Sequence, residues 1–150
     1  MAYWLMKSEP DTFSISDLAR LEQAPWDGVR NYQARNFMRE MRPGDEFLFY
    51  HSSCQPPGAA GIGRIISEPY PDHTAIDPDS PYHDPKATAE KLPWTAVDVA
   101  FVKKFPRLLT LSDMRSLNGL EGLALLQRGS RLSVMPVTDQ QWQVLLAVAS

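Results

Sequence analysis

The sequence predicts an α+β fold, a small mixed or mostly antiparallel β-barrel of about five to six strands flanked by short helices. Its 150 residues, 43% hydrophobic and 22% charged, suit one core, so we expect a single domain over residues 1–150. The strand patterns do not alternate with full-length helices, which argues against a doubly wound parallel sheet. A proline-rich stretch over residues 68–93 interrupts the regular elements, and such long irregular segments are usually functional or disordered.

In the N-terminal half, Pro10 ends an apolar strand pattern, and Ser14 or Ser16 then supplies the N-cap of a helix. Gly61 and Gly63 lie two residues apart in a strand pattern, which indicates a close backbone or ligand approach, or a bulge. The expected elements are a strand over 3–6, a helix over 16–22, a turn over 26–28, a helix over 31–41 closed by a turn over 43–45, and strands over 46–50 and 61–66.

In the C-terminal half, aromatic residues within and beside the proline-rich stretch indicate that it is anchored to the rest of the chain. Residues Thr138 and Gln141 match a capping box, which predicts the start of the last helix. The expected elements are a strand over 95–105, a helix over 112–117 capped by Thr110, a strand over 131–137, and a final helix that buries Trp142, Leu145, Leu146 and Ala149.

Charge and cysteine content exclude several classes of protein. The formal net charge of −3 argues against coating nucleic acid through bulk electrostatics, although four arginines between residues 27 and 42 could form a local basic face. The lone Cys54 permits no internal disulfide and no cysteine-based zinc cluster. No apolar run is long enough for a membrane span, and residues 7–9 interrupt any signal-peptide pattern. We therefore expect a cytoplasmic protein, or a nuclear one in a eukaryote, without a membrane partner.

Two segments, 3–10 and 26–36, place aromatic side chains directly beside charged and amide groups. A pocket for a flat polar ring needs this mixture, because an aromatic face stacks on the ring while fixed donors and acceptors read its edge. Trp26 is as compatible with a ring platform as with the core, whereas Trp4, Trp94 and Trp142 fit core positions.

Catalytic and metal-binding alternatives have weaker signals. The run from His51 to Cys54 suggests a small hydrolase or nucleotide-processing enzyme using His51 with Ser52, Ser53 or Asp84, but no nucleophile elbow is present. The His and Asp residues over 73–84 lack calcium-loop spacing, and no phosphate-binding glycine loop occurs, so we expect no cofactor and no metal. A protein–protein adaptor using the same pocket is a further alternative.

Four motifs in order make the chain resemble the EVE domain family. They are the segments 4–10, 26–36, 49–53 and 82–86. The resemblance implies a PUA-like fold, kinship with the YTH domains that read methylated adenine in RNA, and a non-catalytic reader of modified bases, chiefly modified cytosine such as 5-methylcytosine or 5-hydroxymethylcytosine. It places Trp26 as the first aromatic of a cage around the base and either Tyr82 or His83 as its completion.

A base inside a duplex is hidden, so a reader must flip it out or meet it single-stranded. Trp26 is expected to stack on the ring, Glu9 or Asp27 to accept from an exocyclic amine, and Ser8 or Asn31 to donate to ring acceptors. The ligand is a modified base in DNA or RNA, and the protein is expected to be a monomer. The predicted pocket comprises Lys7, Ser8, Glu9, Trp26, Asp27, Asn31, Tyr50, His51, Ser52 and Tyr82, with Arg30, Arg35 and Lys86 on flanking phosphates.

Overall fold

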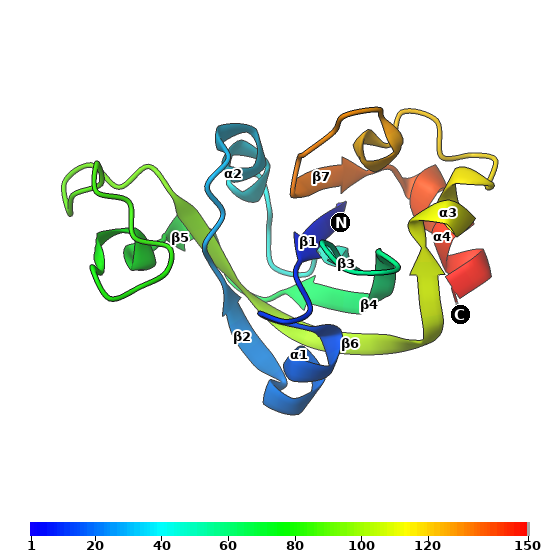
Figure 1. The fold of residues 1–150 in the computed structure, drawn as a ribbon, viewed down its shortest axis with the longest axis horizontal. Helices are drawn as coiled ribbons and strands as arrows, with labels where there is room; N and C mark the ends of the chain where they lie inside the picture. Colours follow the sequence, from blue (N-terminus) through cyan, green and yellow to red (C-terminus); the bar gives the residue numbers. More distant parts are fainter. Residues whose placement is uncertain (150) are drawn as a thin grey trace.

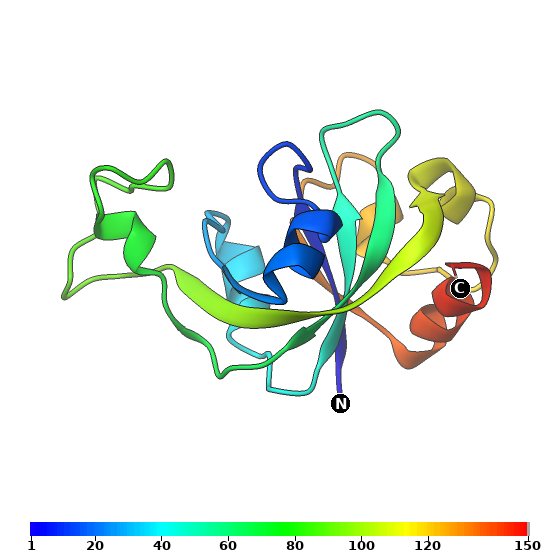
Figure 2. The same cartoon turned by 90° about the horizontal axis from the view of Figure 1, so that it is seen from below.

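The computed structural model describes residues 1–149, which form a seven-stranded sheet curved into an open barrel with short helices around it (Figures 1 and 2). The strand order is β2-β6-β4-β3-β1-β7, and β5 pairs with β6 off this path. Only the β1–β3 pair is parallel among the pairings of the described residues. In chain order the elements are β1 (Tyr3–Ser8), α1 (Ile15–Leu21), β2 (Gln23–Trp26), α2 (Tyr32–Met38), β3 (Glu46–His51), β4 (Gly58–Ile65), β5 (Tyr70–Pro71), the 3-10 turn η1 (His73–Ile76), β6 (Thr95–Thr110), α3 (Leu111–Arg115), the 3-10 turn η2 (Ala124–Leu126), β7 (Val134–Val137) and α4 (Asp139–Ala149).

The predicted α+β barrel is confirmed, and the differences from the expected elements have local causes. The sequence pattern missed β2 because Pro25 and exposed neighbours disguise it; β2 pairs only with β6, and proline is tolerated in such edge strands. β5 is a two-residue strand, too short for a period-2 pattern. β6 continues to Thr110 instead of ending near residue 105, through the positions where its register against β4 shifts.

The barrel interior is rich in aromatic residues. Phe47 and Phe49 of β3 are fully buried and lie against Trp26 at the end of β2. Two of the three glycines of β4 allow close packing: a Cβ at Gly63 would overlap the Phe47 ring, and one at Gly61 would overlap a backbone oxygen of β6. The register of β4 also shifts beside both glycines, so close approach and bulge occur together.

Two predicted helix starts are confirmed by their caps. The Ser14 hydroxyl accepts from Asp17 N, and the Asp17 carboxylate accepts from Ser14 N, which closes a capping box at α1. Thr138 and Gln141 make the same reciprocal pair at α4. The helix α2 ends at Met38, three residues before the expected Met41, because a turn follows Arg39 and returns Met41 to the core.

The proline-rich segment 68–93 projects from one end of the barrel, opposite α3 and α4 (Figure 1). Hydrogen bonds anchor it near its start and at its middle, as expected. The Tyr70 hydroxyl donates to Asp98 over 2.5 Å, and Trp94 Nε1 donates to Asp84 over 2.8 Å. No helix in residues 1–149 is long and apolar enough to cross a membrane.

Candidate functional site

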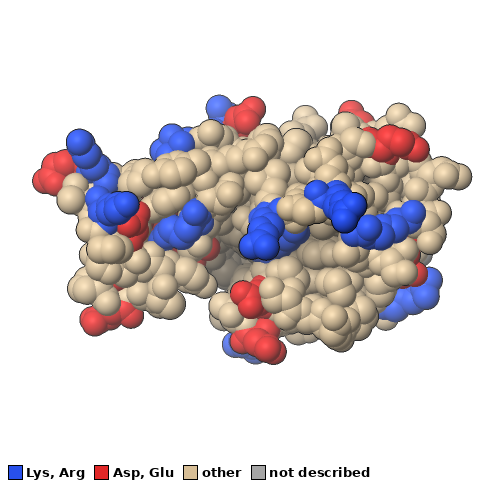
Figure 3. Space-filling model, turned by 45° about the horizontal axis from the view of Figure 1, so that its top comes forward, with Lys and Arg blue, Asp and Glu red and all other residues tan. Residues whose placement is uncertain are grey.

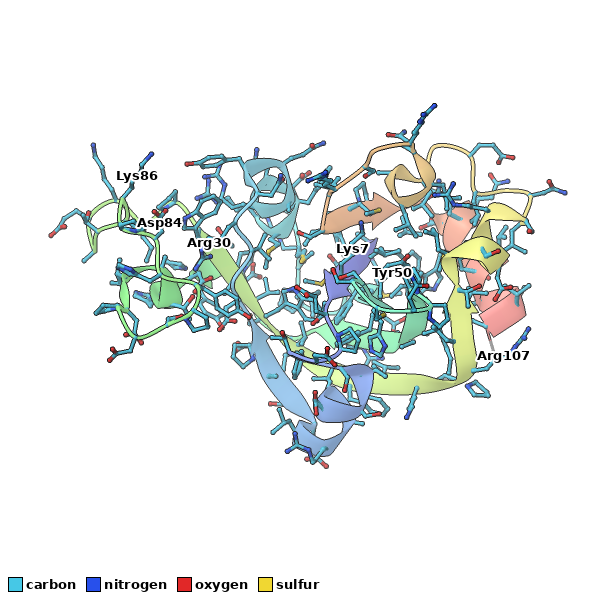
Figure 4. The ribbon with its side chains drawn as sticks, in the orientation of Figure 1. Lys7, Arg30, Tyr50, Asp84, Lys86 and Arg107 are labelled. Atoms are coloured by element: carbon cyan, nitrogen blue, oxygen red, sulfur yellow. The ribbon has the colours of Figure 1, made fainter. Side chains whose placement is uncertain are left out.

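A cleft of about 950 Å³ opens between the end of β1, the β2–α2 connection and the projecting segment. Figure 3 shows a hollow on this face with a row of lysine and arginine side chains along one side and acidic side chains along the other. Lys7 and Arg30 line the cleft from opposite directions, Lys7 from the barrel and Arg30 from the connection toward the projecting segment (Figure 4). Of the ten predicted pocket residues, seven line this cleft: Lys7, Ser8, Glu9, Trp26, Asp27, Ser52 and Tyr82.

Trp26 forms the floor of the cleft and belongs largely to the core. Its side chain is only 6% exposed, and the rings of Phe13, Phe47 and Phe49 meet it edge-on with centroids 5.2–6.1 Å away. The indole therefore offers a ligand a small part of its surface rather than a free face. Core packing thus takes up most of the ring, and the expected stacking role stays a prediction.

Tyr82 forms a wall of the cleft beside Gly28. Gly28 has a φ of +80°, and a Cβ there would lie 2.7 Å from the Tyr82 ring, so the absence of a side chain lets the ring reach the cleft. Tyr82 is half-buried, and burial raises the pKa of its hydroxyl, with the nearby Asp27 carboxylate adding to this effect. Both effects favour the neutral phenol. His83, the other aromatic considered for the cage, is exposed and does not line the cleft.

Arg30 holds the Tyr82 wall in place. Its guanidinium makes five hydrogen bonds, which use all of its N–H groups; two of them reach the Tyr82 carbonyl at 2.8 and 3.0 Å. One more pairs with Asp72 at 2.9 Å, and Asp72 also accepts from Gly28 N at 2.8 Å. Asp72 is 1% exposed, and burial alone would raise its pKa, but the hydrogen bonds from Thr74, Gly28 and Arg30 outweigh burial and lower it.

The polar groups of the cleft differ in whether they are free to bind a ligand. The Ser8 hydroxyl donates to the Phe13 carbonyl over 2.7 Å, so its proton is already used, whereas the Glu9 side chain is exposed at the rim. Burial raises the pKa of Asp27, and the Asp72 carboxylate raises it further. Burial lowers the pKa of Lys7, whose Nζ lies 5.9 Å from the Tyr50 ring centroid. The cleft therefore offers a ligand both carboxylate acceptors and an ammonium donor.

Three predicted pocket residues lie elsewhere. Asn31 caps α2 through its side-chain oxygen and faces a separate hollow. Tyr50 is 3% exposed and lies beneath Lys7. His51 Nε2 accepts from Ile15 N over 3.1 Å, and burial followed by the charge of Lys104 lowers the pKa of the imidazole. Tyr50 and His51 are neighbours on β3 and point to opposite faces of the sheet, so alternation could direct only one of them to the cleft. Lys7 covers the Tyr50 ring, and His51 is occupied by the Ile15 N–H.

The three residues predicted to contact phosphates lie in different surroundings. Arg30 lines the cleft, but all of its N–H groups donate hydrogen bonds within the protein. Arg35 donates to Asn36 and to the Pro93 carbonyl. Lys86 lies at the far end of the projecting segment, away from Lys7 (Figure 4). These arginines fasten the projecting segment to the barrel.

Sequence reasoning missed the loop before β7 as a part of the site. Ser130, Arg131 and Ser133 line the cleft opposite the projecting segment. The signal available in the sequence was the Arg-Gly-Ser-Arg run over 128–131, two arginines around a turn-forming pair. Within residues 1–149, no group of three or more His, Cys, Asp or Glu side chains is arranged to hold a metal ion.

Substituting Gly28 with alanine is expected to disturb the cleft wall. Gly44 has a similar φ of +98° but open space around it, so Gly44→Ala is a matched control for backbone strain. Each substitution should cost about 1–2 kcal/mol of unfolding free energy through the left-handed backbone, and Gly28→Ala more because the Tyr82 ring must move. Chemical denaturation of both variants measures the difference. Equal losses in the two variants would show that Gly28 does not position Tyr82.

The curved mixed sheet with its cleft at the end of the first strand defines a PUA-like α+β protein. The chain belongs to the EVE domain family, whose model matches residues 2–148. It is 40% identical over 166 residues to human thymocyte nuclear protein 1, covering 98% of this chain and 73% of that protein.

Solved structures agree with this placement. A crystal structure of a Pseudomonas syringae protein is 64% identical, has a TM-score of 0.97 and covers 99% of this chain and 100% of its own. The human THYN1 protein in complex with 5-methylcytosine-containing DNA is 38% identical with a TM-score of 0.95, covering 100% of this chain and 98% of that chain.

Proposed function

We propose that this chain is a single, non-catalytic EVE domain that reads a modified cytosine by taking the base into the cleft beside Tyr82. The observation that carries the proposal is the cleft itself, with an aromatic wall and floor and a rim of carboxylates and one ammonium. Its volume of about 950 Å³ exceeds what one base needs, so a flanking sugar also fits. The human THYN1 protein, solved with 5-methylcytosine-containing DNA, supports cytosine as the base.

Each group of the cleft has a role in this proposal. Tyr82 stacks on the extruded ring, and the exposed part of Trp26 closes the floor. Glu9 or Asp27 accepts from the exocyclic amine of cytosine, since carboxylates are the natural partners of that donor. The added methyl group rests on apolar surface, which Phe13 and Val29 supply from the lining. This role places the protein in the compartment that holds the nucleic acid, which is the cytoplasm in bacteria and the nucleus in eukaryotes.

The geometry of His51 supports a binding role over hydrolysis. A general base needs a free lone pair on the imidazole, yet Nε2 already accepts from the Ile15 backbone N–H. The other ring nitrogen must then carry the proton in the neutral form, which burial favours by lowering the pKa. Ser52 and Ser53 line the cleft, but the alternative enzyme would have to break this bond to activate either hydroxyl.

Binding of matched short duplexes and single strands tests the proposal. Each probe carries one central cytosine, 5-methylcytosine, 5-hydroxymethylcytosine, adenine or N6-methyladenine, in DNA and in RNA, at one salt concentration. We expect a preference of tenfold or so for a modified cytosine. The Tyr82→Ala variant should lose about 1–3 kcal/mol of stacking, roughly 5- to 150-fold in affinity for that probe.

The control variant is Tyr32→Ala, which removes the same side chain from an exposed site on α2 outside the cleft. It should bind like the unmodified protein, and circular dichroism should show both variants folded. Equal affinity for every probe, or equal losses in both tyrosine variants, would refute the base-reading role and favour the adaptor or enzyme alternatives.

A further inference from the structure

A second hollow of about 290 Å³ adjoins the cleft, and the two share Ser130 and Arg131 as a common wall. It lies between the start of α2 and the loop before β7, and its lining is mostly polar. We propose that this hollow holds the sugar–phosphate backbone next to the recognised base, with Arg128 and Arg131 as the phosphate contacts; this inference rests on the proposed function. The full lining is Asn31, Gln33, Ala124, Gln127, Arg128, Gly129, Ser130, Arg131 and Leu132.

Arg128 and Arg131 differ from the other arginines near the site in having no partner. Both side chains are exposed, and neither makes a hydrogen bond, ion pair or ring contact with any residue in 1–149. Arg30 and Arg35, by contrast, are bound to backbone carbonyls and side chains of the chain. A guanidinium offers five donors in a fork that matches phosphate oxygens, so two unpaired arginines at one hollow suit an anionic backbone.

The placement of the two hollows gives the backbone a path. A base taken into the cleft must leave its own phosphates at the rim, because the backbone continues in both directions. Arg131 lines both hollows and so lies where the nucleic-acid backbone leaves the cleft in one direction. Arg128, on the other side of Gly129, lines only the second hollow and lies one step further along. Figure 3 shows a row of basic side chains beside the hollow on this face, while carboxylates occupy the opposite side.

The small size and polarity of the second hollow set its ligand class. Its volume lies at the low end of ligand pockets, which suits one sugar–phosphate unit and not a second stacked base. Aromatic side chains are absent from its lining, so it has no stacking surface. The Asn31 side-chain oxygen is already used by the Ala34 N–H of α2, which leaves its amide protons for an acceptor such as a phosphate or sugar oxygen.

The salt dependence of binding tests this inference. The probes are a short DNA duplex with a central 5-methylcytosine and the matched unmodified duplex, each titrated across a range of sodium chloride concentrations. A phosphate contact contributes about 0.9 to the slope of log K against log salt on a duplex. The double variant Arg128→Gln/Arg131→Gln should therefore flatten the slope by nearly two and weaken both duplexes about tenfold or more at 0.1 M salt.

The matched control is Lys103→Gln/Arg107→Gln, which removes the same charge from exposed positions of β6 that line neither hollow. Arg107 lies at the far end of β6 from Arg30 (Figure 4). This control should change the slope by much less than the loop variant.

The two proposals fail in different ways. A wild-type protein that binds both duplexes equally overturns base reading, yet the slope still tests the loop arginines. An unchanged slope in Arg128→Gln/Arg131→Gln overturns the phosphate assignment, even where the wild-type protein prefers 5-methylcytosine. A lost preference with an unchanged slope also overturns it, because the arginines would then read the base. Support requires a flatter slope with the ratio of the two duplex affinities unchanged from that of the wild type.

Discussion

Replacing Trp26 with alanine is expected to lower the free energy of unfolding by about 3–5 kcal/mol. The indole is 6% exposed and is surrounded by Phe13, Phe47 and Phe49, so truncation leaves a cavity that these rings cannot fill. Domains of this size have about 5–15 kcal/mol of total stability, so the loss takes a large fraction. Urea denaturation followed by tryptophan fluorescence or circular dichroism measures it.

This expectation changes how Trp26 can be used to test base recognition. A loss of DNA affinity in Trp26→Ala would mix stacking with unfolding, whereas Tyr82→Ala removes a half-buried wall. The control is Trp26→Phe, which keeps an aromatic ring in the cluster and should recover much of the lost stability. A Trp26→Ala protein that unfolds at the same urea concentration as the wild type would contradict the core role. It would favour a role for the indole in ligand binding.

The sequence predicted the barrel because its main strands and helix caps are local signals. A continuous apolar run marked β3, alternating apolar residues marked most of β6, and the side chains of Ser14 and Thr138 marked two helix starts. The missed strand β2 has no such pattern, since its identity comes from pairing with β6 across more than 70 residues of chain. Long-range pairing of this kind leaves little trace in a short window.

Site residues could be predicted where several of them lie in one short segment. They could not be predicted where the fold brings distant segments together. The segments around Lys7 and Trp26 place aromatic residues beside charged ones, which made them recognisable in the sequence, and both line the cleft. Whether an arginine is free cannot be read locally: Arg30 is consumed by Asp72 and the Tyr82 carbonyl, which lie over 40 residues away. The position of Arg131 could not be predicted for the same reason, since Arg131 reaches the cleft only because β7 pairs with β1.

Replacing Asp72 with asparagine is expected to cost about 3 kcal/mol of unfolding free energy, because it leaves the Arg30 charge without its partner. Asp72 joins both sides of the cleft: it accepts from Gly28 N and from Arg30, which in turn holds the Tyr82 carbonyl. Asparagine has nearly the same shape but offers donors where the carboxylate accepted. Binding of the preferred nucleic acid should weaken as well, since the Tyr82 wall loses its tether.

The control is Glu46→Gln, which breaks the Arg64–Glu46 pair at 3.1 Å, whose side chains are 49% and 19% exposed. That pair should contribute only about 0–1 kcal/mol, since solvent reaches the Arg64 guanidinium and screens the attraction. The double variant Asp72→Asn/Arg30→Gln should recover part of the stability lost in Asp72→Asn, because it removes the unpaired charge. Similar losses in Asp72→Asn and Glu46→Gln would show that burial adds nothing to the Arg30–Asp72 pair.

The pH dependence of stability provides a second measurement on the same residue. The pKa of Asp72 is lowered in the folded protein, so its carboxylate contributes stability above the unfolded-state pKa of about 4. As pH falls through the lower folded-state pKa, the carboxylate is protonated and this contribution disappears. The difference in unfolding free energy between the wild type and Asp72→Asn should therefore be constant from pH 5 to 8 and shrink below about pH 4. A difference that persists undiminished at pH 2 would mean that the side chain stabilises the cleft through shape alone, without its charge.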